Sequence, residues 1–214
     1  MIALNWWREQ IEYPAKSEPE WSALVERWYQ LDTPAYVLAE TYWRLRSKLT
    51  ETPEWLLLAS PGASNLTDSQ FAATTAPSPA KFVHTLPNIR SASLLQVMRW
   101  SGKVLCLQND PYTIVSALTE SVHLVGEGAI WIAAVTGHGG RFTGHLLTLG
   151  GSDQISALKV SKSSAGTRFT GEDRDKDLLL WINDSAVAGR PFEAPGFTLR
   201  SSFGQPVDLR RSES

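Results

Sequence analysis

The side chains best suited to covalent chemistry in this chain are one cysteine and four histidines. Cys106 is the single cysteine among 214 residues. A cysteine becomes nucleophilic when a helix N-terminus or a nearby cation stabilises its thiolate. Cys106 instead falls inside the apolar run Val104–Leu107, which predicts a small buried hydrophobic side chain. A single cysteine also excludes an intramolecular disulfide and fits a reducing cytoplasm.

The four histidines, His84, His123, His138 and His145, form no familiar metal-binding motif. The spacing of His138 and His145 is not that of a usual zinc-ligand pair, and His123 falls on the polar face of a predicted helix. The acidic residues between Glu172 and Asp177 alternate with basic ones, which indicates a solvated loop. The sequence therefore predicts no metal and no cofactor.

The segment Gly137-His138-Gly139-Gly140 follows a predicted strand, as phosphate-binding loops do. It lacks the Walker lysine and the spaced glycines of a dinucleotide-binding loop. A hairpin-like loop is the better interpretation. The chain also lacks a Gly-x-Ser-x-Gly elbow and a Cys-x-x-Cys pair.

Strands alternating with helices are expected to position these residues. Apolar runs predict strands at 55–60, 103–108, 129–135 and 178–182, and an adjacent pair of strands at 145–149 and 155–162. Helical patterns are predicted at 17–31, 33–49, 88–100 and 112–125. This order predicts an α/β fold with a layered mixed, mainly parallel sheet and helices on both faces.

Local signals support the helices. Apolar residues at helical spacing follow Ser17, and Thr33-Pro34 is expected to begin the second helix. Gly102 is expected to close the helix that starts at Asn88. The helix at 112–125 is expected to begin at Asn109 or Asp110, with Asp110 as its N-cap.

Composition bounds the class of protein. The chain is expected to be one domain, 1–214, with a helical tryptophan-rich segment at 1–53 and an irregular tail at 190–214. Six of its nine tryptophans lie in the first 55 residues, and they fill the core or supply a docking surface. A net charge of −2 argues against nucleic acid as a partner. The sequence shows no signal peptide and no apolar run long enough to span a membrane.

The region from about residue 55 to 150 resembles the first half of the β-ketoacyl synthases, which have the thiolase fold. Ser78, Pro79, Phe82 and Asn88 match the segment before a helix in that family. A glycine, a strand and a second helix follow in the family's order, here Gly102, Val104–Leu107 and the helix that contains Ala117 and Leu118. The nearest likeness is to short ketoacyl-synthase-like proteins encoded beside bacterial aryl-polyene genes.

The resemblance implies a subunit without condensing activity. The position of the family's nucleophilic cysteine carries Asp110 and Pro111, and neither can hold an acyl chain as a thioester. The synthase's second-half histidines have no counterpart here. The resemblance thus implies a chain-length-factor-like partner, which forms a heterodimer with a full-length β-ketoacyl synthase and meets acyl-carrier protein through that complex. Interface and acyl-tunnel positions are expected at Phe82, Thr85, Leu86, Asn88, Leu105 and Leu107.

Two other classes of function stay open. One is an acyl-thioester-processing enzyme of the same pathway that uses His84 or Asp110. The other is a self-associating scaffold protein unrelated to acyl chemistry.

Overall fold

A computed structural model describes residues 2–49, 51–59, 73, 87–107, 113–124, 128–138, 141–150, 158–162, 176, 178–179, 192–194 and 197–201. These residues form one eight-stranded sheet in the order β3-β2-β4-β5-β1-β6-β8-β7. The strands are β1 (Ile2–Glu12), β2 (Trp55–Ala59), β3 (Lys103–Leu107), β4 (Ile130–His138), β5 (Arg141–Leu149), β6 (Leu158–Lys162), β7 (Phe192–Ala194) and β8 (Phe197–Ser201).

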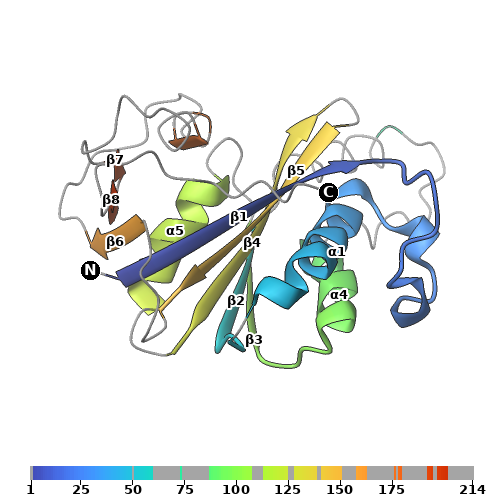
Figure 1. The fold of residues 1–214 in the computed structure, drawn as a ribbon, viewed down its shortest axis with the longest axis horizontal. Coiled ribbons are helices and arrows are strands. Elements are labelled where there is room, and N and C mark those ends of the chain that lie inside the picture. The colour runs from blue at the N-terminus through green and yellow to red at the C-terminus, as the bar shows by residue number, and fades with distance from the viewer. Residues whose placement is uncertain are drawn as a thin grey trace.

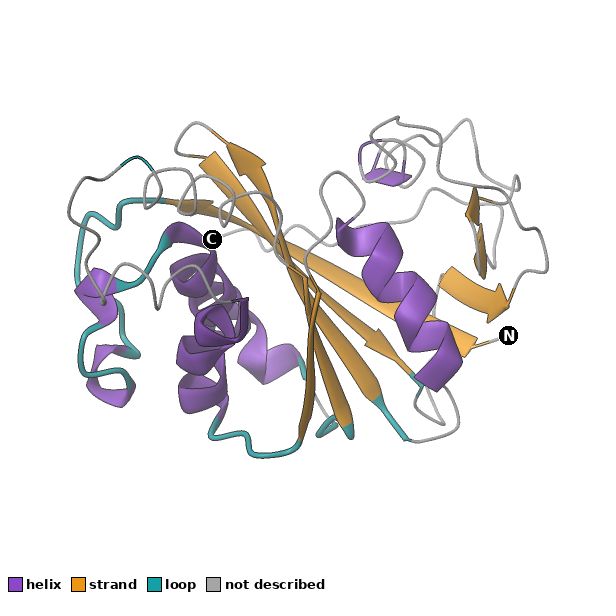
Figure 2. Ribbon diagram, turned by 180° about the vertical axis from the view of Figure 1, so that it is seen from behind, coloured by secondary structure: helices purple, strands orange, loops and turns teal. Residues whose placement is uncertain are grey.

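Helices cover both faces of the sheet, which confirms the predicted α/β class. Helices α1 (Thr33–Leu45) and α4 (Pro87–Met98) pack side by side on one face, and α5 (Thr113–Leu124) lies on the other (Figures 1 and 2). Each face has its own apolar core. Leu57, Ile132 and Leu147 point toward α5, whereas Leu58, Ala133 and Leu146 point toward α1 and α4. The alternation follows from the two-residue repeat of a strand.

The sheet is parallel in only part of its width. β2 pairs with β3 and with β4 in parallel, and the other neighbouring pairs are antiparallel. The expected parallel arrangement is thus correct for β3, β2 and β4. β4 and β5 follow one another in the chain and pair antiparallel.

The N-terminal segment corrects two predictions. Residues 2–12 were expected within a helical segment, but they form β1, which pairs with β5 on one side and β6 on the other. The two strands at 145–149 and 155–162 are therefore not adjacent, because β1 lies between them. The buried positions of β1 switch faces between Trp6 and Glu9, so its sequence shows no simple alternation.

The predicted helix at 17–31 is also wrong. Two 3₁₀ helices, Ser22–Leu24 and Trp28–Gln30, occupy this segment. Its apolar residues recur mainly at intervals of three, which suits a 3₁₀ turn as well as an α-helix. Trp21 and Val25 are buried against α1, and the Trp21 indole donates to Glu40 at 2.7 Å. Packing against α1 therefore holds the segment in place.

The ends of α1 and α4 differ in detail from prediction. Asp32, not Thr33, caps α1, because its carboxylate accepts the Ala35 amide at 3.0 Å. Past Leu45 the chain continues as a 3₁₀ helix, Arg46–Lys48. Arg99, with φ of 52°, ends α4 in the left-handed region. Gly102 has another role, since a Cβ there would lie 2.0 Å from the Trp100 ring.

The C-terminal part contains more structure than expected. Leu178 and Leu179 are helical, so the predicted strand at 178–182 is wrong at these residues. An apolar run of this length does not distinguish a buried strand from a buried helix. The tail at 190–214 is not irregular throughout, because β7 and β8 form an antiparallel pair within it. Phe197 is fully buried in the core on the α5 face.

Candidate partner interface

Strand β3 lies at one edge of the sheet. It pairs with β2, Leu105 opposite Leu57, and no described strand lies on its outer side. An edge strand presents a row of backbone groups that another strand can bind. The resemblance implies a partner interface at Leu105 and Leu107, and both residues lie on this edge strand.

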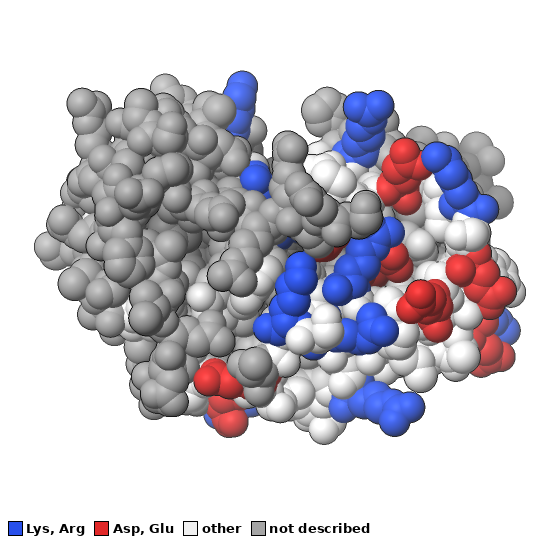
Figure 3. Space-filling view, viewed as in Figure 1, with Lys and Arg blue, Asp and Glu red and all other residues white. Residues whose placement is uncertain are grey.

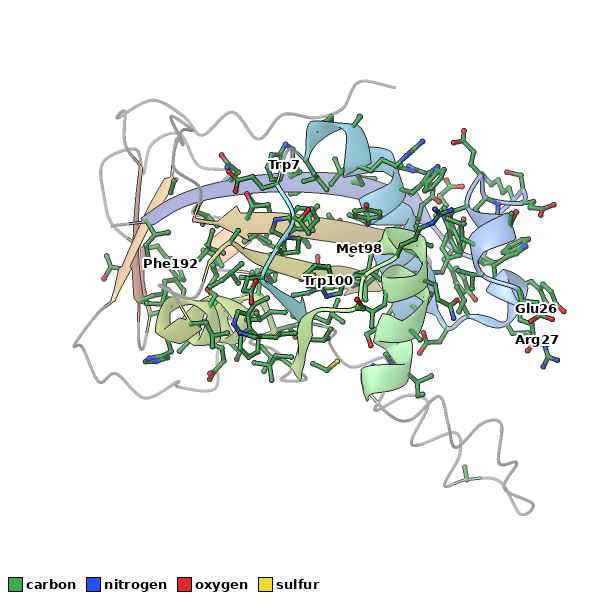
Figure 4. The ribbon with its side chains drawn as sticks, turned by 90° about the horizontal axis from the view of Figure 1, so that it is seen from below. Trp7, Glu26, Arg27, Met98, Trp100 and Phe192 are labelled. Atoms are coloured by element: carbon green, nitrogen blue, oxygen red, sulfur yellow. The ribbon has the colours of Figure 1, made fainter. Side chains whose placement is uncertain are left out.

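Four apolar residues of β3 are half-buried. Leu105 and Leu107 pack against the core on the α5 face, and Val104 and Cys106 pack against the core on the α4 face. Met98 and Trp100 at the end of α4 lie near the same part of the sheet and are also half-buried (Figure 4). The single charge on β3 is Lys103 at its first residue, which contacts Glu54 at 3.3 Å. The edge is thus an apolar strip without charges between residues 104 and 107.

Cys106 has the environment of a structural cysteine. Burial raises the pKa of its thiol, and a hydrogen bond with Ser91 only partly opposes that effect. The thiol is therefore protonated near neutral pH and is a poor nucleophile.

Several predicted site residues fall outside the described part of the chain. Phe82, Thr85 and Leu86 lie there, as do Asp110 and Pro111 at the expected nucleophile position. Asn88 belongs to the first turn of α4. Of the residues proposed for the interface, the structure therefore brings together Leu105 and Leu107 on β3.

A buried polar cluster was missed by sequence reasoning. Trp6 donates from Nε1 to Nδ1 of His145 at 3.3 Å, and Nε2 of His145 lies 2.7 Å from Oγ1 of Thr136. His145 is 1% exposed, and burial lowers its pKa to about 3, with Arg8 contributing. The neutral ring thus joins β1, β5 and β4. In the sequence, His145 alternates with Leu147 and Leu149 along β5. This spacing indicates that His145 shares their buried face, and it was the available sequence signal.

The other chemical candidates remain apart. His123 is exposed on α5, as predicted, and His84 lies outside the described residues. Within the described ranges, no three histidine, cysteine or acidic residues lie close enough to hold a metal ion. In the same part of the chain, no helix is long and apolar enough to cross a membrane.

The tryptophans divide between core and surface. Trp6, Trp21 and Trp131 are buried, and others, including Trp7 and Trp28, are half-buried. In the space-filling view of the described surface, Lys and Arg side chains gather near the middle, with Asp and Glu side chains beside them (Figure 3). After α1, for example, Arg46 lies 4.0 Å from Glu20. Such mixed charges do not make a continuous basic surface.

Comparisons with known proteins agree with this architecture. No family model and no curated protein matches the sequence. Among solved structures, the chain is similar to a chain of the ketosynthase ApeO in complex with its chain length factor ApeC from Xenorhabdus doucetiae. The TM-score is 0.60 at 13% identity, and the match covers 92% of this chain and 97% of that chain. The ketosynthase-like fold expected from the sequence is confirmed.

Proposed function

We propose that this protein is a ketosynthase-like subunit without condensing activity, which pairs with a full-length β-ketoacyl synthase and shapes its acyl tunnel. The observation that carries the proposal is the apolar edge strand β3 in a ketosynthase-like fold. The chain of the ApeO–ApeC structure that has this fold belongs to a complex of a ketosynthase with its chain length factor. A similar role for this chain explains an edge free of charges between Val104 and Leu107.

The proposed contact is backbone pairing between β3 and an edge strand of the synthase. Leu105 and Leu107 would pack on the tunnel side, and Phe82, Thr85, Leu86 and Asn88 would extend the interface. Stable interfaces of obligate type bury on the order of 2,000 Å² or more, so contacts beyond β3 are required. Acyl-carrier protein would act on the assembled pair, and the pathway would be of the aryl-polyene or related polyketide type in the cytoplasm.

Co-expression with a ketosynthase encoded by a neighbouring gene tests the proposal. We expect the wild-type pair to co-purify, and we expect Leu105→Lys to abolish co-purification because it places a charge in the strip. Ala23→Lys adds the same charge at an exposed position of the N-terminal segment and should leave the complex intact. Circular dichroism of each isolated variant separates loss of binding from loss of folding.

The single cysteine supplies an independent measurement on the wild-type chain. Cys106 lies on β3 and is half-buried, so its alkylation rate reports access to the edge. We expect slower alkylation when the synthase is added. A chain that stays monomeric, with an unchanged Cys106 alkylation rate, would contradict the proposal. A self-associated chain that ignores the synthase would favour the scaffold alternative.

A further inference from the structure

A group of polar side chains lies on the sheet away from β3. Arg8 and Gln10 on β1, Thr136 on β4, and Thr143 on β5 share the face that α5 covers farther along the strands. The register places Gln10 opposite Thr143 and Thr143 opposite Thr136. We call these four residues the polar patch. It lies at the carboxyl end of β4, the end of parallel strands near which α/β folds bind ligands.

The hydrogen bonds of His145 fix the role of Thr136. The Trp6 indole can only donate, so Nδ1 of His145 accepts and the ring proton lies on Nε2. That proton is donated to Oγ1 of Thr136. The Thr136 hydroxyl therefore acts as an acceptor toward His145, and its own proton is available to another group.

Thr143 has the same arrangement. Its Oγ1 accepts from the side-chain amide of Gln10 at 2.8 Å. The two threonines are direct cross-strand partners, which places their Cβ atoms roughly 5 Å apart. Both side chains are half-buried and reach the surface. Two hydroxyl protons thus lie side by side with no acceptor among the described hydrogen bonds.

The charges around the polar patch are mainly positive. Arg8 is close enough to His145 to affect its titration. Arg141 lies two residues from Thr143 along β5. It pairs with Glu12 on β1 and with His138 on β4. The Glu12 carboxylate forms an ion pair with Lys16. The positive charges of Lys16 and, to a smaller extent, Arg141 lower the pKa of this carboxylate. The polar patch therefore offers donors and positive charge.

We propose that the polar patch binds an oxyanion of the phosphate class, with the hydroxyls of Thr136 and Thr143 as donors and Arg8 supplying charge. The oxyanion is inorganic phosphate or the phosphate group of a larger organic molecule. The site is independent of the β3 interface, because it lies on β1, β4 and β5. The result of a phosphate-binding test therefore neither supports nor contradicts pairing through β3.

Titration followed by two-dimensional ¹H–¹⁵N NMR tests this site. The side-chain amide of Gln10 is a direct reporter, because it contacts Thr143. We expect inorganic phosphate and glycerol 3-phosphate to shift this signal and the backbone amides of residues 136 and 143. Sodium chloride at equal ionic strength should not. Tighter binding of glycerol 3-phosphate would indicate an organic phosphate ligand, and equal affinity would indicate the free ion.

A matched pair of variants sharpens the test. Thr143→Val removes one donor and should weaken phosphate binding about five-fold, the equivalent of one hydrogen bond. Thr148→Val is the control, because Thr148 accepts from Asn5 on the same pair of strands but on the opposite face. If Thr143→Val fails to fold, Thr136→Val takes its place. Equal shifts with chloride, or unchanged affinity in the folded variant, would overturn the proposal.

Discussion

At the scale of single residues, His145 joins three strands through its two ring nitrogens. Protonation would place a second donor against the Trp6 indole and a positive charge near Arg8. The described hydrogen-bond partners of the ring are Trp6 and Thr136, and neither carries a negative charge, so a buried positive charge there is costly. The neutral imidazole is therefore part of the folded state.

The low pKa of His145 predicts acid sensitivity. Unfolded, the ring binds a proton at its ordinary pKa of 6.5, whereas the folded ring does so at about 3. The free energy of unfolding should therefore fall as pH decreases from 6.5 toward 3, by roughly 4 kcal/mol in total. Urea unfolding at a series of pH values between 7 and 4.5 gives the free energy of unfolding at each pH. This free energy should change less steeply with pH in His145→Gln than in wild type. His123→Gln, which removes an exposed histidine, is the matched control.

At the scale of elements, polar contacts fasten α1 to α4. The Asp32 carboxylate both caps α1 and accepts Nε of Arg90 at 3.0 Å, and Arg90 is 3% exposed. Ser93 of α4 donates to the Ala35 carbonyl of α1 at 2.9 Å. These contacts fix how the two helices sit on the sheet.

Removing the Asp32 carboxylate should destabilise this pair of helices. Asp32→Ala loses the cap and separates a buried arginine from its carboxylate, so we expect a cost of about 3 kcal/mol. Asp32→Asn keeps a capping oxygen and should cost less. Chemical denaturation of both variants measures the difference, and equal costs would show that the Arg90 contact, not the cap, carries the effect.

The end of α4 predicts a stabilising change. Arg99 is exposed and has a positive φ, a region that glycine occupies without a steric penalty. Arg99→Gly should raise the free energy of unfolding by about 0.5–1 kcal/mol, net of the added freedom of the unfolded chain. Arg99→Ala keeps the penalty and should bring no gain. A glycine variant less stable than wild type would contradict this interpretation of the helix end.

At the scale of the whole molecule, strands β6, β8 and β7 extend the sheet beyond β1 and reach α5. α5 contacts β6 and β8 as well as β2 and β4. Leu178, Phe192 and Phe197 belong to the same buried cluster as α5. The C-terminal strands therefore complete the core on that face.

The position of Phe197 predicts that this C-terminal part is required for stability. Phe197 is fully buried, so Phe197→Ala should cost about 3–5 kcal/mol through the cavity it leaves. Thermal and urea unfolding would measure the loss. Tyr29→Ala, at a residue that is 65% exposed, provides the aromatic control and should change stability little.

The isolated chain is expected to form no condensation product. Its cysteine is a packed residue of β3 with a raised thiol pKa, and the resemblance to ketosynthases implies that Asp110 and Pro111 stand at the nucleophile position. Incubation with acyl- and malonyl-carrier protein should yield no product and no acyl adduct by mass spectrometry. An adduct on Cys106 would refute this expectation.

The sequence by itself determined several of the local elements. The apolar runs at β2, β3 and β4 and the stripes of α1 and α5 were read correctly to within a few residues, because strand and helix periods act over short distances. Only the tertiary structure decided that β1 separates β5 from β6. The pairing of β1 with β5 joins residues far apart in the chain, such as Leu4 and Leu149, and the buried positions of β1 change face. The same holds for the cluster of Trp6, Thr136 and His145. Each of these residues is unremarkable in its own segment, and the sheet register brings the three together.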